Sequence, residues 1–172
     1  GYSLGVDPRT FNGLMVEKSE VNATHDGRVL QGPAEPVEGK SYQRLINNEI
    51  SGDMVEDLRT TIVGGEPTIV FRKRRPLARR FMNENADVHM QRPVDCFSAE
   101  EIDLIKRFAA KIGLDWGGVD VLRDAETGKI YIVDANKTDM GPPVALPLGQ
   151  KLRSTRLMAR RFAACYAPKV RG

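Results

Sequence analysis

The sequence predicts a single domain of the α/β or α+β class. Strand-like and helix-like segments are mixed along the chain, but strands and helices do not alternate strictly. The 172 residues, 41% of them hydrophobic, suffice for one core and are few for two. No internal repeat is present, and Cys96 and Cys165 are isolated, so we expect neither a repeat architecture nor a disulfide framework.

Charge and hydropathy argue against several classes of function. Lys and Arg together number 26 and Asp and Glu number 23, and a net charge of +3 is too small to indicate a nucleic-acid partner by itself. No apolar run is long enough to span a membrane, and none resembles a signal peptide. We therefore expect a cytoplasmic protein with no membrane partner.

The first part of the chain predicts short strands. Residues 13–18 are apolar and strand-like, and a polar stretch with a turn-forming Asp26–Gly27 pair leads into "VLQGP". This order indicates a hairpin or a flexible loop after a strand. A linker rich in Pro and Gly fills 32–40, and 41–46 predict another short strand that ends in a loop.

A longer hairpin is predicted next. Within "MVEDLRTTIVGGEPTIVFRKRR" (54–75), apolar and polar residues alternate around a Gly-Gly turn, which is typical of two paired strands. Residues 76–97 show no clean period and predict an ordered loop. The six basic residues within 71–80 indicate either a nucleic-acid patch or a solvated strand end and loop.

The clearest helix is predicted at 98–113. Ser98 and Glu101 form a capping box at its start, an apolar stripe follows at helical spacing, and Gly113 is the expected stop. Two strands around "DAETG" come next. A second, basic helix spans 148–166, and its basic stripe predicts a solvated face or a contact with a partner.

Polar side chains stand where the last two strands should carry apolar ones. If "VDVLR" and "KIYIVDAN" pair with an index sum of 252, Asp120 lies opposite Ile132, and all even-numbered residues share one face. Asp120, Asp134 and Asn136 then converge within about 5–8 Å. Two carboxylates about 5 Å apart repel by about 3 kcal/mol at an effective dielectric of about 20, and a protonated carboxyl, a basic partner or a divalent cation must offset this. Mg²⁺ or Mn²⁺ suits these oxygen donors, and the other interpretation is a strand end that faces solvent.

At these residues the chain resembles the ATP-grasp superfamily. The metal motif of that superfamily is an acidic residue on one strand and acid-x-Asn on its hairpin partner, and "GVDVL" and "IVDAN" match it. Asp134 stands where most members have Glu. The resemblance covers about residues 14–146 and implies an α+β ATP-grasp fold, in which an antiparallel sheet packs against helices and the nucleotide lies between two lobes. It implies one such domain or a fragment of it, with 1–46 in the small nucleotide lobe and 47–172 in the large lobe that carries the metal site.

The resemblance also implies roles for residues outside the metal motif. In that family a lysine ends the phosphate-loop strand, and backbone groups at the end of the "SYQRLI" segment, about Arg44 to Ile46 here, bond adenine. A "D-x-R" strand approaches ribose and substrate, and an Arg–Asn pair contacts phosphate. Arg79 or Arg80 fits the arginine of that pair, and Arg44 replaces the Glu that is common in the hinge. The implied catalytic residues are Arg59 and Arg79, the implied cofactor-binding residues are Lys18, Arg44, Leu45, Ile46, Asp57, Asn83 and Ile132, and the implied metal ligands are Asp120, Asp134 and Asn136.

The activity that the resemblance implies is that of an ATP-dependent carboxylate–amine ligase. Such an enzyme uses ATP and Mg²⁺ (or Mn²⁺) to convert a carboxylate to an acyl-phosphate, which an amine or similar nucleophile attacks. The expected partners are a small-molecule or peptide carboxylate and an amine acceptor, and a homodimer is compatible with the sequence. A second hypothesis is a non-catalytic or partner-dependent ATP-binding module, since Asp134 is one methylene shorter than Glu. A basic nucleic-acid-binding domain ranks third, because no aromatic residues interleave the arginines.

Overall fold

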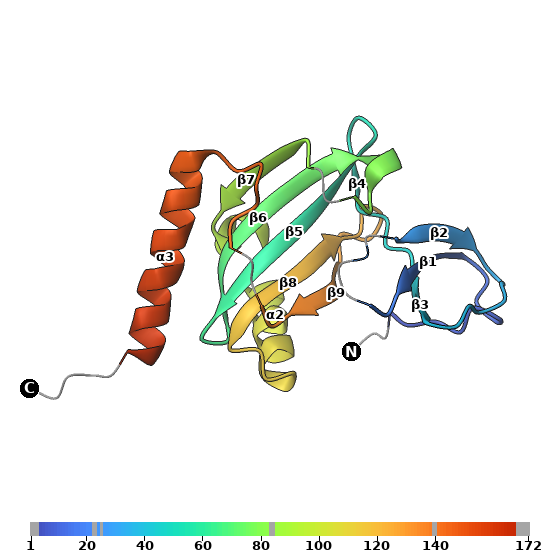
Figure 1. The fold of residues 1–172 in the computed structure, drawn as a ribbon, viewed down its shortest axis with the longest axis horizontal. Helices are drawn as coiled ribbons and strands as arrows, with labels where there is room; N and C mark the ends of the chain where they lie inside the picture. The colour runs from blue at the N-terminus through green and yellow to red at the C-terminus, as the bar shows by residue number, and fades with distance from the viewer. Residues whose placement is uncertain (1–3, 22–23, 25, 83–84, 139–140, 168–172) are drawn as a thin grey trace, which may run out of the picture.

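The computed structural model describes residues 4–21, 24, 26–82, 85–138 and 141–167. Two antiparallel sheets form the body of the molecule, and its last helix stands at the end opposite the smaller sheet (Figure 1). The fold is α+β, as the sequence indicated. No helix in the described part of the chain is long and apolar enough to cross a membrane.

The smaller sheet has the strand order β2-β1-β3, and all its pairs are antiparallel. Its strands are β1 (Leu14–Ser19), β2 (Arg28–Gln31) and β3 (Lys40–Arg44). The buried Glu17 carboxylate accepts hydrogen bonds from the Tyr42 hydroxyl at 2.8 Å and from Arg28 Nε at 2.7 Å. These bonds offset the cost of burying its charge. The strands predicted at 13–18 and 41–46 are confirmed, although the second ends at Arg44.

The larger sheet has the order β7-β6-β5-β8-β9, and the short β4 pairs with β5. All its neighbours are antiparallel. The predicted Gly-Gly hairpin is confirmed, and Gly64 and Gly65 have φ of 64° and 72°, a conformation that favours glycine. The strands are β4 (Glu49–Ile50), β5 (Met54–Val63), β6 (Glu66–Pro76), β7 (Asp87–Gln91), β8 (Trp116–Arg123) and β9 (Ile130–Asn136).

The segment predicted as a loop at 76–97 holds regular structure. It contains a 3₁₀ turn η1 (Leu77–Arg79), the edge strand β7 and a short helix α1 (Pro93–Cys96). The loop prediction is therefore wrong over β7. That strand does alternate, with Val88 buried between two polar residues, but five residues are too few for the period to stand out among irregular neighbours.

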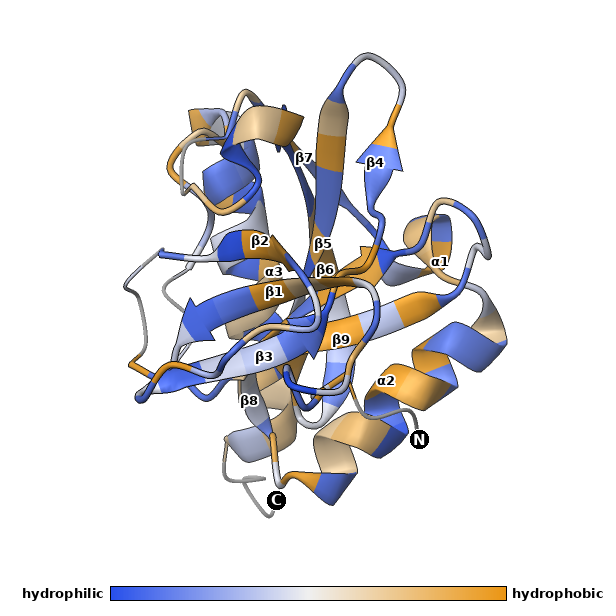
Figure 2. Ribbon diagram, turned by 90° about the vertical axis from the view of Figure 1, so that its right-hand side faces the viewer, coloured by the Kyte–Doolittle hydropathy of each residue, from blue (hydrophilic) through white to orange (hydrophobic). Residues whose placement is uncertain are grey.

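Two helices cover parts of opposite faces of the larger sheet. Helix α2 (Ala99–Lys111) begins at Ser98, whose capping box with Glu101 is present, and the chain turns at Gly113, with φ of 64°. Figure 2 shows polar and apolar bands alternating along α2, whose apolar side packs on the sheet. Helix α3 (Leu148–Tyr166) packs on the other face through Met158, beside Phe71 and Val88. Both helix predictions are confirmed.

The two cores identify the sides of the larger sheet. One cluster includes Leu58, Val119 and Val121 and lies under α2. Residues that alternate with these, including Arg59 and Asp120, point to the face that α3 covers only in part. We call this the open face, and the predicted site lies on it.

Candidate functional site

The β8–β9 hairpin brings the predicted metal ligands to the open face. Asp120 lies directly opposite Asp134, and Asn136 lies opposite Gly118. The predicted register, with Asp120 opposite Ile132, is wrong. Val121 pairs with Ile132, so one extra residue is inserted in β9 between Ile132 and Asp134. Beyond this bulge the index sum is even, so all three side chains share the face.

The bulge changes which residue of β9 lies beside the predicted ligands. Ile132, expected on the ligand face as a cofactor-binding residue, instead packs against the core cluster beneath α2. Its predicted placement is wrong, because the inserted residue reverses the face of every residue before it. Tyr131 takes the open face opposite Leu122. Sequence reasoning missed Tyr131, since no local signal marks the bulge.

Arg59 from the neighbouring strand β5 lies directly opposite Asp120. Its Nη1 donates to Asp120 Oδ2 at 3.0 Å. The guanidinium crosses β8 above Gly118, where a Cβ atom would lie 2.7 Å from Nη2 and 2.8 Å from Cζ. A residue without a side chain at 118 is thus what allows Arg59 to reach Asp120.

The second carboxylate oxygen of Asp120 is the strongest indication that this face binds a ligand. Oδ1 is buried and accepts no hydrogen bond within the described part of the chain. An unsatisfied buried polar group costs about 1–3 kcal/mol, and more when it is charged. A hard cation would satisfy this oxygen, and the exposed Asp134 and half-buried Asn136 lie beside it to complete the donor set.

The donor set is small. The described residues contain no group of three or more His, Cys, Asp and Glu side chains that could hold a metal ion. A cation here would therefore use two carboxylates, the Asn136 carboxamide oxygen, and oxygens from water or a ligand. Mg²⁺ fits such a set because it retains waters and phosphate oxygens and needs few protein ligands.

A second unsatisfied group lies on the same face. Arg75 is buried, and its Nε has no hydrogen-bond partner in the described structure. Burial lowers the pKa of its guanidinium, and the nearby charge of Asp120 opposes that change. The open face thus carries one orphaned donor and one orphaned acceptor, and an anion bound together with a cation would satisfy both. The sequence did not single out Arg75.

Asp57, expected near a ribose, is held inside the protein. It forms an ion pair with Arg75 and accepts a hydrogen bond from Asn48 Nδ2 at 3.0 Å. Arg80 in turn donates to Asn48 Oδ1 at 2.7 Å, and burial lowers the pKa of Arg80. Arg79, predicted as catalytic, ends η1 and is exposed, so Arg80 is the more enclosed of the two. Asn83 lies outside the described residues.

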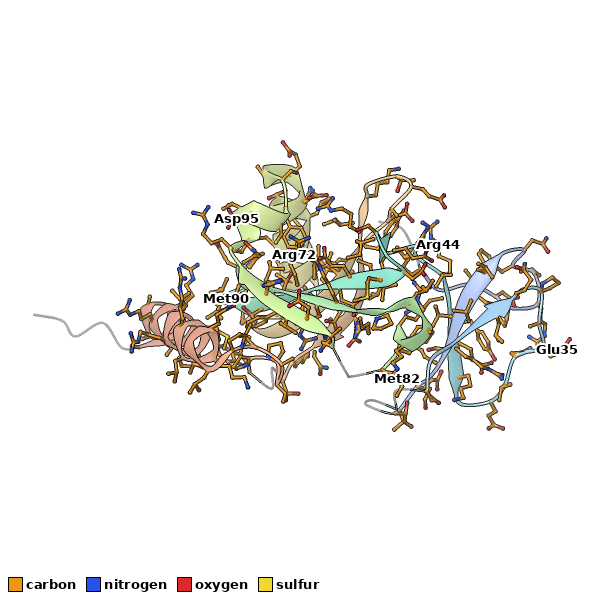
Figure 3. All side chains as sticks on the ribbon, turned by 90° about the horizontal axis from the view of Figure 1, so that it is seen from above. Glu35, Arg44, Arg72, Met82, Met90 and Asp95 are labelled. Atoms are coloured by element: carbon orange, nitrogen blue, oxygen red, sulfur yellow. The ribbon has the colours of Figure 1, made fainter. Side chains whose placement is uncertain are left out.

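Arg44 links the two sheets. Its Nη2 donates to the Tyr131 hydroxyl at 2.8 Å, and its guanidinium stacks 4.9 Å from the centre of that ring. Figure 3 shows Arg44 at the junction between the smaller and larger sheets. This contact places a cation and an aromatic ring side by side at the edge of the open face.

Some backbone groups of the predicted adenine-binding segment form hydrogen bonds within the protein. The Arg44 and Leu45 amides donate to Leu4 and Leu14, each at 2.9 Å. The Ile46 carbonyl accepts a hydrogen bond from Arg80 at 3.3 Å. A nucleobase would have to use the remaining groups of this segment. Lys18 lies half-buried on β1, opposite Ser41 of β3.

The basic run at 71–80 is not a free cationic patch. Arg72 and Arg74 both bind Glu56, at 2.8 and 2.7 Å, and Arg75 pairs with Asp57. Charges neutralised inside the protein contribute little to binding phosphate backbones. The nucleic-acid interpretation therefore loses its main support.

Comparisons with known proteins identify the fold. No family model and no curated protein matches this chain. Among solved structures, the ATP-grasp ligase PsnB with a phosphomimetic variant of its minimal precursor, Mg and ADP superposes with a TM-score of 0.55 at 16% identity, covering 89% of this chain and 46% of PsnB. PsnB with its minimal precursor, Mg and ADP gives 0.54 at 16% identity, over 87% and 46%. PsnB with the precursor peptide PsnA2 and AMPPNP gives 0.53 at 16% identity, over 87% and 46%.

The likeness establishes the ATP-grasp fold that the sequence motif indicated. The chain spans just under half the length of the PsnB structures it matches. Sequence identity is low, so residue roles must be argued from the geometry of this chain.

Proposed function

We propose that this chain binds ATP with Mg²⁺ (or Mn²⁺) on the open face. We further propose that it acts as an ATP-dependent carboxylate–amine ligase. The observation that carries the proposal is the buried, unsatisfied Oδ1 of Asp120, with Asp134 opposite and Asn136 near it. The fold adds support, since PsnB structures of this fold hold Mg with ADP.

Each polar residue of the open face has a proposed role. Asp120, Asp134 and Asn136 would hold the cation, which supplies positive charge to the nucleotide phosphates. Arg59 fixes the orientation of Asp120 by holding Oδ2 and leaves Oδ1 available. The Arg75 Nε would donate to an anionic oxygen.

The smaller sheet would close over the nucleotide from the other side. We propose that residues 1–46 act as the small nucleotide lobe and 47–172 as the large lobe. Lys18 would then neutralise phosphate charge from β1. Arg44 and Tyr131 would form a wall for the base, in the place where the sequence motif indicated Ile132. Asp57 would orient Arg75 and would not contact ribose directly.

The proposed chemistry depends on positioning and charge, since phosphoryl transfer needs little covalent assistance. The γ-phosphoryl group passes from ATP to a substrate carboxylate, giving an acyl-phosphate and ADP, and an amine then displaces phosphate. The unsatisfied Nε of Arg75 favours an anionic substrate group on this face. PsnB binds a precursor peptide, so a peptide carboxylate is the substrate class that we propose to test first.

The test measures ATP binding through the thermal-unfolding midpoint, with and without Mg-ATP. The unmodified protein is compared with the Asp120→Asn variant. Ligand at about 100 times its dissociation constant stabilises by about 2.7 kcal/mol, which raises the midpoint by roughly 5–10 °C for a domain of this size. Asp120→Asn should remove the shift seen with Mg-ATP. The matched control is Asp103→Asn, which changes an exposed carboxylate on α2. An unshifted midpoint in the unmodified protein would refute nucleotide binding.

The second candidate is an ATP-binding module without catalysis of its own. It is favoured by Asp134, which is exposed and shorter than the usual Glu. Binding of Mg-ATP without any release of ADP, in the presence of carboxylate peptides and amines, would support this module. ADP release that requires a carboxylate would support the ligase.

A further inference from the structure

Helix α3 contacts the rest of the protein along one side. Ser154 and Met158 are its buried residues. The Phe162 ring lies edge-on to Trp116 with ring centres 5.3 Å apart, and Arg161 pairs with Glu66 at 3.6 Å. Gln150 Oε1 accepts a hydrogen bond from the Met90 amide at 3.3 Å, and the Tyr166 hydroxyl donates to the Asp115 carbonyl at 3.2 Å. The side of the helix opposite these contacts faces away from the protein.

The side chains on that outward side form a regular pattern. At 100° per residue, the arginines at 153, 156 and 160 fall in one stripe opposite the buried side. Leucines flank this stripe on both edges, with 71% of Leu148, 61% of Leu152 and 39% of Leu157 exposed. A shallow depression runs between the three arginines, Leu152 and Leu157. We call this set the α3 outer surface: Leu148, Leu152, Arg153, Arg156, Leu157 and Arg160.

The three arginines of the α3 outer surface differ from most others in the chain. Arg72 and Arg123, for example, bind Glu56 and Glu101. No ion pair joins Arg153, Arg156 or Arg160 to any residue that the structure describes. Figure 3 shows nitrogen-tipped side chains projecting from α3 at one end of the molecule. Three unpaired cations within two helical turns repel one another, so a negatively charged partner would be stabilising.

We propose that the α3 outer surface docks an acidic amphipathic segment of a partner protein. Each guanidinium can hold a carboxylate through two parallel hydrogen bonds, which a lysine cannot do. The flanking leucines offer apolar contacts for side chains next to those carboxylates. The partner therefore carries a stripe of Asp or Glu with apolar residues on both sides.

The arrangement favours such a segment over two other occupants. A helix that lies on a membrane has an apolar centre and basic edges, whereas here the arginines are central and the leucines are at the edges. A second copy of this surface would bring arginines against arginines, which is destabilising.

The probe is a synthetic helical peptide of about 18 residues, with a Glu stripe flanked by Leu, labelled for fluorescence anisotropy. A matched peptide has Gln in place of every Glu. We expect the Glu peptide to bind at least about tenfold more tightly than the Gln peptide, and to weaken as salt rises from about 0.05 to 0.5 M. Equal affinities, or no binding by the Glu peptide, would overturn the proposal.

Variants locate the binding surface. Arg156→Glu with Arg160→Glu should reduce the affinity for the Glu peptide at least about tenfold. The control, Arg107→Glu with Lys111→Glu, makes the same charge change at the same spacing on α2 and should leave binding unchanged. Circular dichroism confirms that each variant is folded. A control that weakens binding as much as the α3 variant would contradict the assignment to this surface.

Two further measurements test whether a membrane or a second copy of this chain binds the α3 outer surface instead. Binding to vesicles of phosphatidylserine and phosphatidylcholine that outcompetes the Glu peptide would show that α3 serves a membrane. A concentration-dependent dimer that is lost on Leu152→Ser, seen by sedimentation equilibrium without peptide, would show that a second copy covers the surface. Either result would overturn the proposal, and neither depends on the ATP site.

Discussion

Replacing Gly118 with alanine tests the geometry of the open face. A Cβ atom at this position would lie 2.7 Å from Nη2 of Arg59 and 2.8 Å from both its Cζ and Nε. Such contacts are shorter than real Cβ atoms tolerate, so the Arg59 guanidinium must move away. Its 3.0 Å bond to Asp120 would then break.

The expected loss of stability follows from two opposing terms. Hydrogen bonds to charged groups contribute about 1.5–3 kcal/mol, and this pair is well enclosed, with 15% of the Arg59 side chain and 23% of the Asp120 side chain exposed. Alanine restricts the unfolded chain more than glycine does, and this stabilises the folded protein by about 0.4–1 kcal/mol. Gly118→Ala should therefore lower the free energy of unfolding by about 1–2 kcal/mol, or the midpoint by roughly 2–8 °C.

The assay is a double-mutant cycle by urea denaturation. Once Arg59→Ala has removed the guanidinium, the clash is gone and Gly118→Ala should cost nothing or stabilise slightly. The two substitutions should therefore couple by about 1.5–3 kcal/mol. Gly149→Ala is the control, because nothing lies near its Cβ position on α3, and it should not couple to Arg59→Ala. If Gly118→Ala costs the same in both backgrounds, Arg59 does not lie across Gly118.

Two further predictions concern contacts between elements. Arg44→Ala should lower the free energy of unfolding by about 0.5–1 kcal/mol, because it removes a cation–π contact and a hydrogen bond to Tyr131, whereas Arg9→Ala, at an exposed position, should change it by less. Unfolding by urea measures both, and equal effects would contradict a link between the sheets. The Arg123 hydrogen bond lowers the pKa of Glu101 from 4.5, so its stabilisation is complete above that pH and is lost as the pH falls through the folded-state pKa. Glu101→Gln should accordingly flatten the decline of stability below about pH 4.5, and an unchanged acid profile would refute this pairing.

Local sequence patterns predicted most of the elements. The capping box at Ser98 and the stop at Gly113 depend on neighbours in sequence, and both are present in the structure. The same holds for the Gly64–Gly65 turn, since it requires a backbone conformation that glycine adopts readily. The edge strand β7 escaped prediction because five alternating residues give too weak a signal.

The candidate site was predicted only in part. Side-chain alternation with period two placed Asp120, Asp134 and Asn136 on one face, and the structure agrees with that face. The predicted register failed at the bulge in β9, so Ile132 and Tyr131 exchanged sides. The position of a bulge depends on how the strands pack in the sheet, and neither residue type nor spacing predicts it here.

The sequence by itself therefore determined the features that arise between close neighbours along the chain: the helix caps, the glycine turns and the shared face of the acidic hairpin. Only the tertiary structure decided which strand lies next to that hairpin. It placed β5 beside β8, so that Arg59 crosses Gly118 to hold one oxygen of Asp120 while the other stays unsatisfied. Strand order depends on packing between residues about 60 positions apart in sequence, and the energy of such contacts cannot be assigned until the whole sheet and both of its covering helices are assembled.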